Sequence, residues 1–325
     1  MGWMEKRKGV KMNEIAKKIV KKLIEIHGSD TFKIAFLPYK RSMWNGMSSV
    51  YDECINAGID AHVYPIPYFR HDTKSTDTDY DLFEMAEDIE TLKDPDFIAI
   101  HYHFDDQNLV TSMLPEYYTK AIKERYKCKI IFLPYGIKYD VGNEYYLYSG
   151  YIGIDYIFTS EINEDFVEEW KKQGVDFTGR IFPYGTTKLD VSSAMKGRRV
   201  IPDEWKDIIG DKSVTLILNS LTSFINEPYR RTLDYLCYTI QELSKWHIVI
   251  FRPHPLMRQT IKTMVPESEP YWDFMIKELS ALGVIVDESE YLERAMLAAD
   301  YLISDPSSVV IMWEATGKPY TKIRG

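Results

Sequence analysis

Short apolar runs alternate with helical patterns along this 325-residue sequence, and the alternation breaks only once, near residue 195. Strands that alternate with helices are typical of a parallel sheet covered by helices. A chain of this length normally folds into two domains. Because a polar, glycine-containing stretch at residues 192–199 separates the two series, we predict a first domain at residues 1–195 and a second at residues 196–325.

The expected elements follow from the same alternation. The first series predicts strands at residues 33–37, 96–101, 129–133, 155–159 and 178–183, and helices at 43–57, 116–126 and 161–172, the last capped by Ser160. The second series predicts strands at residues 214–218, 247–251, 284–286 and 301–304, and helices at 229–244, 272–282, 291–299 and 309–316. We therefore predict an α/β protein with two Rossmann-like domains that face each other across a cleft. Ligands of such sheets bind beyond the carboxyl ends of the strands, in the loops that follow them.

The composition excludes several classes of protein. With 45% hydrophobic and 27% charged residues, the sequence is that of an ordinary globular protein. It has no apolar run long enough for a membrane span and no apolar signal segment, so we predict a cytoplasmic protein. The net charge of −9 disfavours nucleic acid as a partner. Cys54, Cys128 and Cys237 lack CxxC spacing, which argues against a zinc site and against a redox dithiol.

A basic amphipathic helix is predicted near the N-terminus. Residues 6–22 contain eight lysines and arginines against one acid, Glu14. Ile15, Ile19, Leu23 and Ile26 recur at helical spacing and form an apolar stripe. We expect the stripe to pack on the domain; the alternative is that the helix contacts an anionic membrane surface through its lysines.

The first candidate site motif is the sequence WHIVIFRPHPL at residues 246–256. A strand leads directly into Arg252 and His254, and two prolines fix the backbone on either side of the histidine. Arginine and histidine at the carboxyl end of a strand suit a diphosphate or another oxyanion. The alternative is a structural turn in which the histidine satisfies a carbonyl group. Neither GxGxxG nor GxxxxGK[ST] occurs, so dinucleotide-fingerprint and P-loop sites are not predicted.

The second motif is the sequence ADYLISDPSSVVIMWEATGKP at residues 299–319. Its strand ends at Asp305, and Ser307 or Ser308 then begins a helix. The free N–H groups of a helix start bind anions, although a serine at this position often only caps its own helix. Glu314, two turns further on, is a candidate for a ribose hydroxyl or a solvated surface acid.

Together the two motifs resemble those of the CDP-glycerol glycerophosphotransferases, which make teichoic-acid-type polymers. In the second motif Pro306 stands where the family has a tyrosine. Residues 184–190 (YGTTKLD) are similar to the family's GxPRxD element, with Lys188 at its basic position, and residues 33–70 resemble the first domain of a divergent branch. Relatives continue beyond the second motif through another strand and further helices, so we expect a shortened second domain here.

The resemblance implies a GT-B fold and a CDP-linked polyol phosphate, such as CDP-glycerol, as the donor, with CMP as the leaving group. It implies a polyol-phosphate or glycan acceptor, lipid-linked at the inner face of the membrane and held by the first domain, and no metal or cofactor. The donor contacts that it implies are at His254 and at Ser307 or Ser308, with Arg252 and Lys188 as further carry-overs. Asp305 and Glu314 are donor-binding candidates from their place in the second motif. A nucleotide-sugar glycosyltransferase and a non-catalytic nucleotide-binding subunit are the alternatives.

The family's expected base is missing from the first domain. The family has a histidine in a loop that matches residues 134–138 here, and Tyr135 takes its place, beside Gly136 and Lys138. A tyrosine with an unperturbed pKa of about 10 is a poor base at neutral pH. The sequence DFIAIHYHFDD at residues 96–106 offers a substitute, because a histidine oriented by a carboxylate is a general base. The candidates there are His101, His103 and Asp105, for which metal binding and structural or acceptor-binding roles are the alternatives.

Two further patterns have simpler interpretations. The overlapping DxD patterns of residues 77–81 follow no predicted strand, so we expect a solvated acidic loop rather than a metal site. The aromatic residues at 65–70 and 145–148 either line an acceptor surface or belong to the core.

Overall fold

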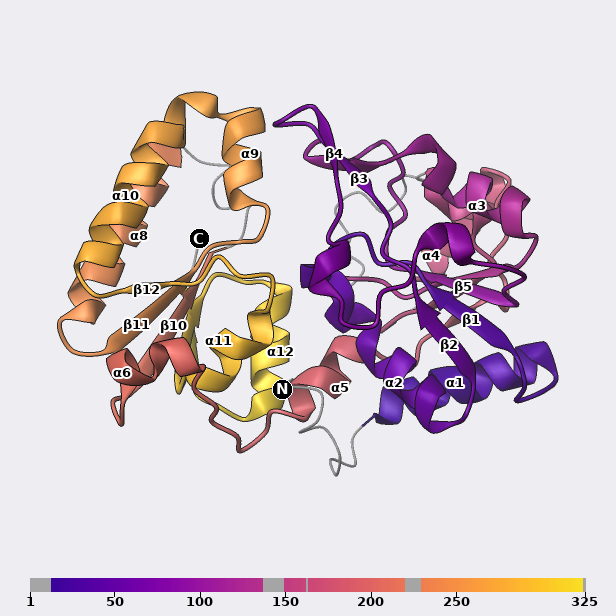
Figure 1. Cartoon of the computed structure of the whole chain (residues 1–325), viewed down its shortest axis with the longest axis horizontal. Helices are drawn as coiled ribbons and strands as arrows, with labels where there is room; N and C mark the ends of the chain where they lie inside the picture. The colour runs from indigo at the N-terminus through magenta and orange to yellow at the C-terminus, as the bar shows by residue number, and fades with distance from the viewer. Residues whose placement is uncertain (1–12, 137–148, 162, 220–228, 324–325) are drawn as a thin grey trace. The chain divides into compact units, whose positions relative to one another are not determined.

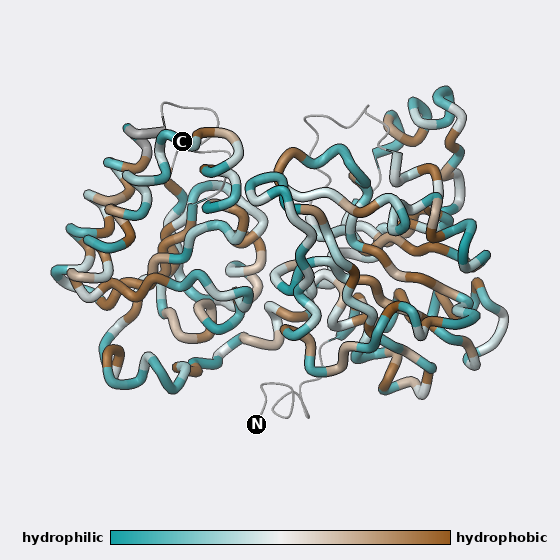
Figure 2. The backbone as a smooth tube through the Cα atoms, turned by 45° about the horizontal axis from the view of Figure 1, so that its top comes forward, coloured by the Kyte–Doolittle hydropathy of each residue, from teal (hydrophilic) through white to brown (hydrophobic). Residues whose placement is uncertain are grey.

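The computed structural model of the chain describes residues 13–136, 149–161, 163–219 and 229–323, and gives no side chains for residues 229, 230 and 232. The chain forms two compact units, Met1–Ala194 and Met195–Gly325, divided one residue before the predicted boundary (Figure 1). Lys138, residues 145–148 and the basic residues before Asn13 lie outside the described residues. In each unit the strands at the centre carry the hydrophobic residues (Figure 2).

The first unit is built on a six-stranded parallel sheet in the order β2-β1-β5-β7-β8-β9. Its strands are β1 (Lys33–Phe36), β2 (Asp60–Val63), β5 (Phe97–Ile100), β7 (Lys129–Phe132), β8 (Tyr156–Phe158) and β9 (Ile181–Phe182). The five predicted strands are confirmed, and β2 is an addition. Because β2 and β5 lie on opposite sides of β1, the sheet has a topological switch point there, where α/β proteins bind ligands.

Alternate residues of β1 enter two different cores, one on each face of the sheet. Ile34 and Phe36 pack with α1 (Glu14–His27) and α2 (Ser48–Asn56). Ala35 and Leu37 pack against residues of α3 (Thr119–Tyr126) and α4 (Glu164–Lys172). This is the side-chain alternation of a strand that is buried on both faces.

The predicted caps and helix starts differ in detail from the structure. Asn163, rather than Ser160, caps α4 by accepting from the N–H of Asp165. Short 3-10 turns, η2 (Arg41–Gly46) and η5 (Pro115–Tyr117), precede α2 and α3, so each predicted helix is a turn followed by a shorter helix.

The predicted N-terminal helix is confirmed as α1, and its apolar stripe is buried in the first unit. The buried residues are Ala16, Ile19, Val20 and Leu23. Asp190, on the short helix α5 (Thr187–Ser193), accepts from the N–H groups of Ile15 at 3.2 Å and Ala16 at 2.9 Å, and so caps the start of α1. Because the apolar stripe is buried, a membrane contact of α1 would have to be made by its exposed lysines. In the described part of the chain, no helix is long and apolar enough to cross a membrane.

A small antiparallel sheet, β4-β3-β6, accompanies the first unit: β3 (Tyr68–Arg70), β4 (Ser75–Asp77) and β6 (Thr111–Met113). Strands of three residues are too short to give a periodic pattern, and none was predicted. The expectation of a solvated acidic loop at residues 77–81 is wrong at Asp79, which is buried. Asp79 accepts from the N–H of Arg41 at 2.7 Å and the hydroxyl of Tyr68 at 3.0 Å, and lies 3.9 Å from the Lys40 ammonium.

The second unit has a five-stranded parallel sheet in the order β12-β11-β10-β13-β14. Its strands are β10 (Val214–Leu218), β11 (Ile248–Arg252), β12 (Ile285–Val286), β13 (Tyr301–Ser304) and β14 (Tyr320–Lys322), of which only β14 was not predicted. The helices α8 (Tyr229–Ser244), α9 (Met257–Met264) and α10 (Glu269–Ala281) pack on one face of the sheet. The helices α11 (Leu292–Ala298) and α12 (Ser308–Thr316) lie on the other face (Figure 1).

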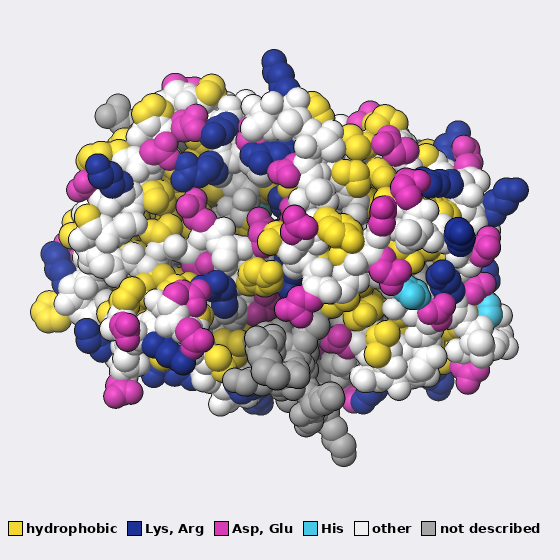
Figure 3. All heavy atoms as spheres, viewed as in Figure 1, with side chains coloured by type: hydrophobic (Ala, Val, Ile, Leu, Met, Phe, Trp, Pro, Cys, Tyr) yellow, Lys and Arg dark blue, Asp and Glu magenta, His cyan; other side chains and the backbone are white. Residues whose placement is uncertain are grey.

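The remaining short helical elements are α6 (Lys206–Ile209), η3 (Tyr80–Leu82), η4 (Ile89–Thr91), η7 (Ser149–Gly153), η8 (Asp203–Trp205) and η9 (Pro266–Ser268). Lysine and arginine side chains are interspersed with aspartate and glutamate on the face of each unit in Figure 3. On the side that Figure 3 shows, the two signs of charge are mixed on each unit.

Candidate functional site

The two motifs of the second unit meet at the carboxyl edge of its sheet. Leu218, the last residue of β10, pairs with Arg252 on β11 and with Ser304 on β13. The three strands therefore end at the same level. The loops that start at Pro253 and Asp305 leave the sheet on either side of β10, about 10 Å apart, because neighbouring strands are about 4.8 Å apart. This is the topological switch point of the sheet, where β11 and β13 flank β10.

The imidazole of His254 is fixed by the turn that begins α9. Its Nδ1 accepts from the backbone N–H of Leu256 at 3.1 Å, and its carbonyl oxygen accepts from the N–H of Met257 at 2.8 Å. A neutral imidazole that accepts at Nδ1 carries its proton on Nε2. The side chain is partly exposed, so Nε2–H is a donor held in one direction at the edge of the sheet. His254 thus belongs to a turn, as in the structural alternative, but its Nδ1 accepts a hydrogen bond instead of donating one to a carbonyl group.

Arg252 differs from the expectation that it contacts the donor directly. Its side chain is 2% exposed and pairs with Asp287, with Nη1 2.6 Å from Oδ2. Its Nη2 donates to the carbonyl oxygen of Ser289 at 2.6 Å, and its Nη1 lies 3.3 Å from the Ser289 hydroxyl. The guanidinium thus joins the end of β11 to the loop after β12. The sequence could not reveal this partner, because Asp287 lies 35 residues away.

The first turn of α12 lacks the side-chain cap that the sequence predicts. Ser307 occupies the cap position with extended backbone angles (φ −151°, ψ 168°), but its hydroxyl makes no capping hydrogen bond. That hydroxyl lies 3.5 Å from the hydroxyl of Ser304 instead. The interpretation that Ser307 serves only to cap its own helix is therefore not supported. Backbone N–H groups at the start of an uncapped helix, beside the hydroxyls of Ser307 and Ser308, are suited to an anion.

The two acids of this motif have partners within the second unit. Asp305 is buried, and the Ser304 hydroxyl donates to its carbonyl oxygen at 2.9 Å and lies 3.5 Å from its carboxylate. Glu314 is exposed, and it accepts from the Tyr320 hydroxyl and from the Lys322 ammonium, 3.5 Å away. The bond from Tyr320 and the charge of Lys322 lower the pKa of Glu314. These contacts fit the interpretation of Glu314 as a surface acid better than a role at the ribose.

In the first unit, His101 lies at the switch point between β1 and β5. Its Nε2 accepts from the backbone N–H of Tyr39 at 3.2 Å, and its ring stacks on the Tyr39 ring with centroids 5.1 Å apart. Burial, with the nearby charge of Lys188, lowers the pKa of His101 to about 3. His103 packs among the rings of Phe104, Phe132 and Tyr151, and burial lowers its pKa to about 3 as well. Both are weak bases at neutral pH, so we do not assign either histidine as the base.

Asp105 does not orient these histidines. Its carboxylate accepts from the N–H of Thr119 at 3.2 Å and lies 3.5 Å from the Thr119 hydroxyl, at the first residue of α3. Burial raises the pKa of Asp105. The loop is also fixed by Gly150, where an added Cβ would lie 2.5 Å from the carbonyl oxygen of His103, so only glycine fits. Within the described residues, no group of three or more His, Cys, Asp and Glu side chains could hold a metal ion.

Lys188 and Tyr135 form a close pair at the same edge of the first unit. Lys188 is 1% exposed, and its Nζ lies 3.3 Å from the centroid of the Tyr135 ring. Its helix, α5, is held to the loop after β1 by Thr187, whose hydroxyl donates to the carbonyl oxygen of Gly46 at 2.5 Å. The side chain that was predicted to contact the donor thus lies against the ring of Tyr135. Gly136 is exposed beside them.

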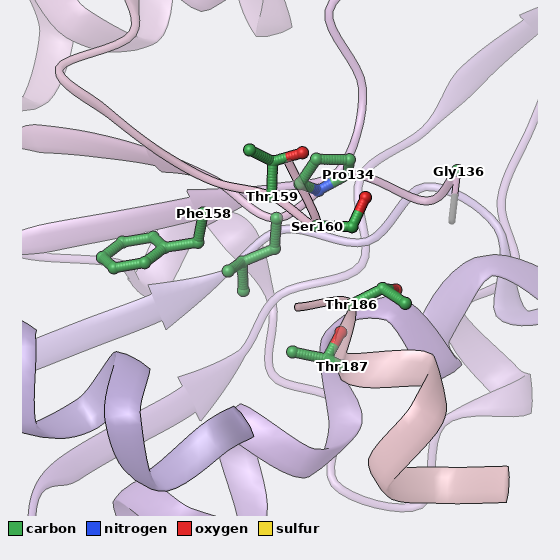
Figure 4. Close-up of a pocket in the computed structure, with 8 residues that line it drawn as sticks. Pro134, Gly136, Phe158, Thr159, Ser160, Thr186 and Thr187 are labelled. Carbon is green, nitrogen blue, oxygen red and sulfur yellow. The ribbon is translucent and has the colours of Figure 1, made fainter. Parts of the chain in front are cut away.

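A small pocket opens beside this pair, and sequence reasoning missed it. In Figure 4, Thr159, Ser160 and Pro134 lie on one side and the first turn of α5, with Thr186 and Thr187, on the other. The complete lining is Leu133, Pro134, Gly136, Phe158, Thr159, Ser160, Thr186 and Thr187. The Thr186 hydroxyl oxygen is buried and has no hydrogen-bond partner among the described residues. The only signal in the sequence was the run of hydroxyl residues directly before Lys188.

The two parallel sheets, each covered by helices on both faces, define an α/β protein of GT-B type with Rossmann-like units. No family model matches the sequence, and no curated protein matches it at a significant level. Solved structures do match in fold. The UDP-GlcNAc 2-epimerase of Methanocaldococcus jannaschii, in complex with UDP-GlcNAc and UDP, is 12% identical over 90% of this chain and 84% of its own, with a TM-score of 0.55.

Two further structures complete the comparison. The S. aureus MnaA–UDP co-structure is 12% identical over 90% of this chain and 80% of its own, with a TM-score of 0.53. The wall teichoic acid polymerase TagF is 16% identical over 90% of this chain and 69% of its own, but its TM-score of 0.45 is too low to support an argument. At these identities the matches establish the fold alone.

Proposed function

We propose that this chain is a transferase that binds a CDP-linked polyol phosphate, such as CDP-glycerol, on its second unit. It transfers the polyol-phosphate group to an acceptor hydroxyl, held by the first unit, and releases CMP. The acceptor is a polyol phosphate or glycan of a cell-surface polymer, lipid-linked at the inner face of the membrane. The donor identity rests on the motif resemblance around His254 and Ser307.

One observation carries the proposal. A fixed Nε2–H donor on His254 and an uncapped helix start at Ser307 lie at the same edge of one sheet, on either side of β10. A diphosphate needs hydrogen-bond donors directed at two phosphate groups, and this edge supplies them from two loops. Arg252 acts as a positioning residue, because its pairing with Asp287 fixes the strand end from which the histidine loop leaves.

The chemistry follows from these donors. Phosphoryl transfer passes through a loose transition state and depends on positioning and on neutralisation of charge. The acceptor oxygen forms a bond to the β-phosphorus of the donor, and the bond from that phosphorus to the bridging oxygen breaks. CMP leaves with the electron pair. Nε2–H of His254 and the N–H groups of α12 stabilise the negative charge on the phosphate oxygens.

The test is donor binding by isothermal titration calorimetry, with His254→Ala and a matched control, His247→Ala. His247 is exposed, directly before the first residue of β11, at the opposite edge of the same sheet. A hydrogen bond to a charged group contributes about 1.5–3 kcal/mol, so we expect His254→Ala to weaken CDP-glycerol binding by about 10- to 150-fold. The control should bind like the wild type. Equal affinity of all three proteins would refute the site.

The titration is extended to CDP-ribitol, CMP, UDP and UDP-GlcNAc, because the M. jannaschii epimerase was solved with UDP-GlcNAc and UDP. Binding of UDP-GlcNAc without CDP-glycerol would favour a nucleotide-sugar glycosyltransferase. Binding of CDP-glycerol without release of CMP in a single turnover, with acceptor present, would favour a non-catalytic nucleotide-binding subunit.

A further inference from the structure

We propose that the small pocket of the first unit binds a hydroxymethyl end of a polyol or sugar through the hydroxyl groups of Thr186, Thr159 and Ser160. The role of this ligand as the acceptor rests on the proposed function. Its binding involves the first unit alone, because every lining residue that the structure describes belongs to that unit. Binding is therefore measured without a donor.

The pocket lies at the carboxyl edge of the first sheet. Its walls are the loops that follow β7 and β8 and the start of α5, the helix that follows β9. These three strands are neighbours in the sheet, so the segments that leave their ends converge (Figure 4). The carboxyl edge is where parallel α/β sheets bind their ligands. The pocket therefore has the position of a ligand site in this fold.

The hydroxyl group of Thr186 is the first sign of a missing partner. Thr186 is 6% exposed, and its Oγ1 is buried without a hydrogen-bond partner among the described residues. It stands at the cap position of α5 but makes no capping hydrogen bond. The neighbouring hydroxyl of Thr187 is satisfied, because it donates to the carbonyl oxygen of Gly46 at 2.5 Å. A buried hydroxyl without a partner costs free energy, which a hydrogen bond to a ligand offsets.

Two more buried polar groups in the segment that packs on the start of α5 share this property. Asn45 Oδ1 and Ser48 Oγ have no hydrogen-bond partner in the part of the chain that the structure describes. They flank Gly46, at which an added Cβ would lie 3.6 Å from the carbonyl oxygen of Pro134, a residue of the pocket wall. Buried polar groups without partners are uncommon in native proteins. Their concentration in two segments in contact indicates a place for a polar ligand.

The chemistry of the lining favours a neutral hydroxyl compound over an anion. Each lining residue that the structure describes is uncharged, whereas an oxyanion is bound best by charged donors. A hydroxyl group both donates and accepts, so the hydroxyls of Thr159, Ser160 and Thr186 match those of a polyol or sugar. Leu133 and Phe158 supply apolar surface for the carbon atoms that carry the ligand's hydroxyls. Because the pocket is small, it takes one end of such a compound.

The test is binding of glycerol to the full chain by saturation-transfer NMR titration, with Thr186→Val and a matched control, Thr260→Val. Thr260 lies on α9 in the second unit, is 3% exposed and also has a buried hydroxyl without a partner among the described residues. Valine keeps the shape of threonine and removes only the hydrogen-bonding group. A neutral hydrogen bond contributes about 0.5–1.5 kcal/mol, so we expect Thr186→Val to weaken glycerol binding by about 2- to 12-fold. The control should bind like the wild type.

Thermal unfolding separates a binding role of Thr186 from a structural one. Because its hydroxyl has no partner in the fold, Thr186→Val should unfold at the temperature of the wild type or above it. Ser160→Ala, at a partly exposed position, gives a second variant that should also weaken binding if Thr186→Val does not fold. No saturation transfer to glycerol from the wild type, or equal affinity of the wild type and the folded pocket variants, would overturn the inference.

Competition experiments identify the ligand class. Displacement of glycerol by ribitol or by glucose supports the pocket and distinguishes a polyol from a sugar. Displacement by inorganic phosphate would show an anion site and refute the proposed ligand. If glycerol binds as expected and CDP-glycerol does not bind in the calorimetric titration, the proposed function fails and the pocket stands. If CDP-glycerol binds and glycerol does not, only the pocket is refuted.

Discussion

Acidification should destabilise the first unit through His101 and His103. Both rings are buried, and burial lowers both pKa values to about 3, against about 6.5 in an unfolded chain. Between these two values the unfolded state binds a proton that the folded state does not. The free energy of unfolding therefore falls as the pH falls below about 6.5, by about 1.36 kcal/mol per pH unit for each histidine.

The magnitude is large enough to measure. At pH 5, about 1.5 units below the unfolded pKa, each histidine should cost about 2 kcal/mol, and the pair about 4 kcal/mol. A typical domain is stable by about 5–15 kcal/mol, so a loss of about 4 kcal/mol is a large fraction of the stability of the first unit. Hydrogen–deuterium exchange of peptides from β5 and β7, corrected for intrinsic rates, gives the opening free energy of this unit without a contribution from the second.

The comparison uses His103→Leu, with His247→Leu as the control because His247 is exposed. We expect His103→Leu to reduce the acid-dependent slope between pH 6.5 and 4.5 by about 1.36 kcal/mol per pH unit, whatever the substitution does to stability at neutral pH. The control should keep the slope of the wild type. If His103→Leu also keeps that slope, the buried ring titrates normally and the reasoning is wrong.

Two substitutions test contacts that lie outside the reaction. Arg252→Met leaves Asp287 buried without its partner, so we expect the free energy of unfolding in urea to fall by about 3–5 kcal/mol. The double variant Arg252→Met/Asp287→Leu should recover part of this loss. The absence of any recovery would contradict the pairing. Asp190→Ala removes the acceptor for the N–H groups of Ile15 and Ala16. We expect the free energy of unfolding to fall by about 1–2 kcal/mol and amide hydrogen exchange in α1 to become faster. Unchanged exchange in α1 would argue against the cap.

The sequence alone predicted every strand of the two parallel sheets except β2 and β14. Residues 130–133 are apolar throughout, and residues 214–218 are apolar except for Thr215. Such runs favour parallel strands buried on both faces. The helices α5, α6 and α9 were not predicted, and neither were the strands that are short or lie at sheet edges: β2, β14 and the three-residue strands of the small sheet. Their few residues carry no periodicity, and neighbouring strands decide whether they pair.

For the candidate site, the sequence indicated which loops to examine and which residue types stood in them, including His254, Ser307, Lys188 and Tyr135. Tertiary structure decided what those side chains do, because their partners lie far along the chain. Arg252 pairs with Asp287 and so has a structural role, whereas Lys188 lies against the ring of Tyr135, 53 residues before it in the chain. A charge acts over a few ångströms in space, and only the folded chain sets those distances.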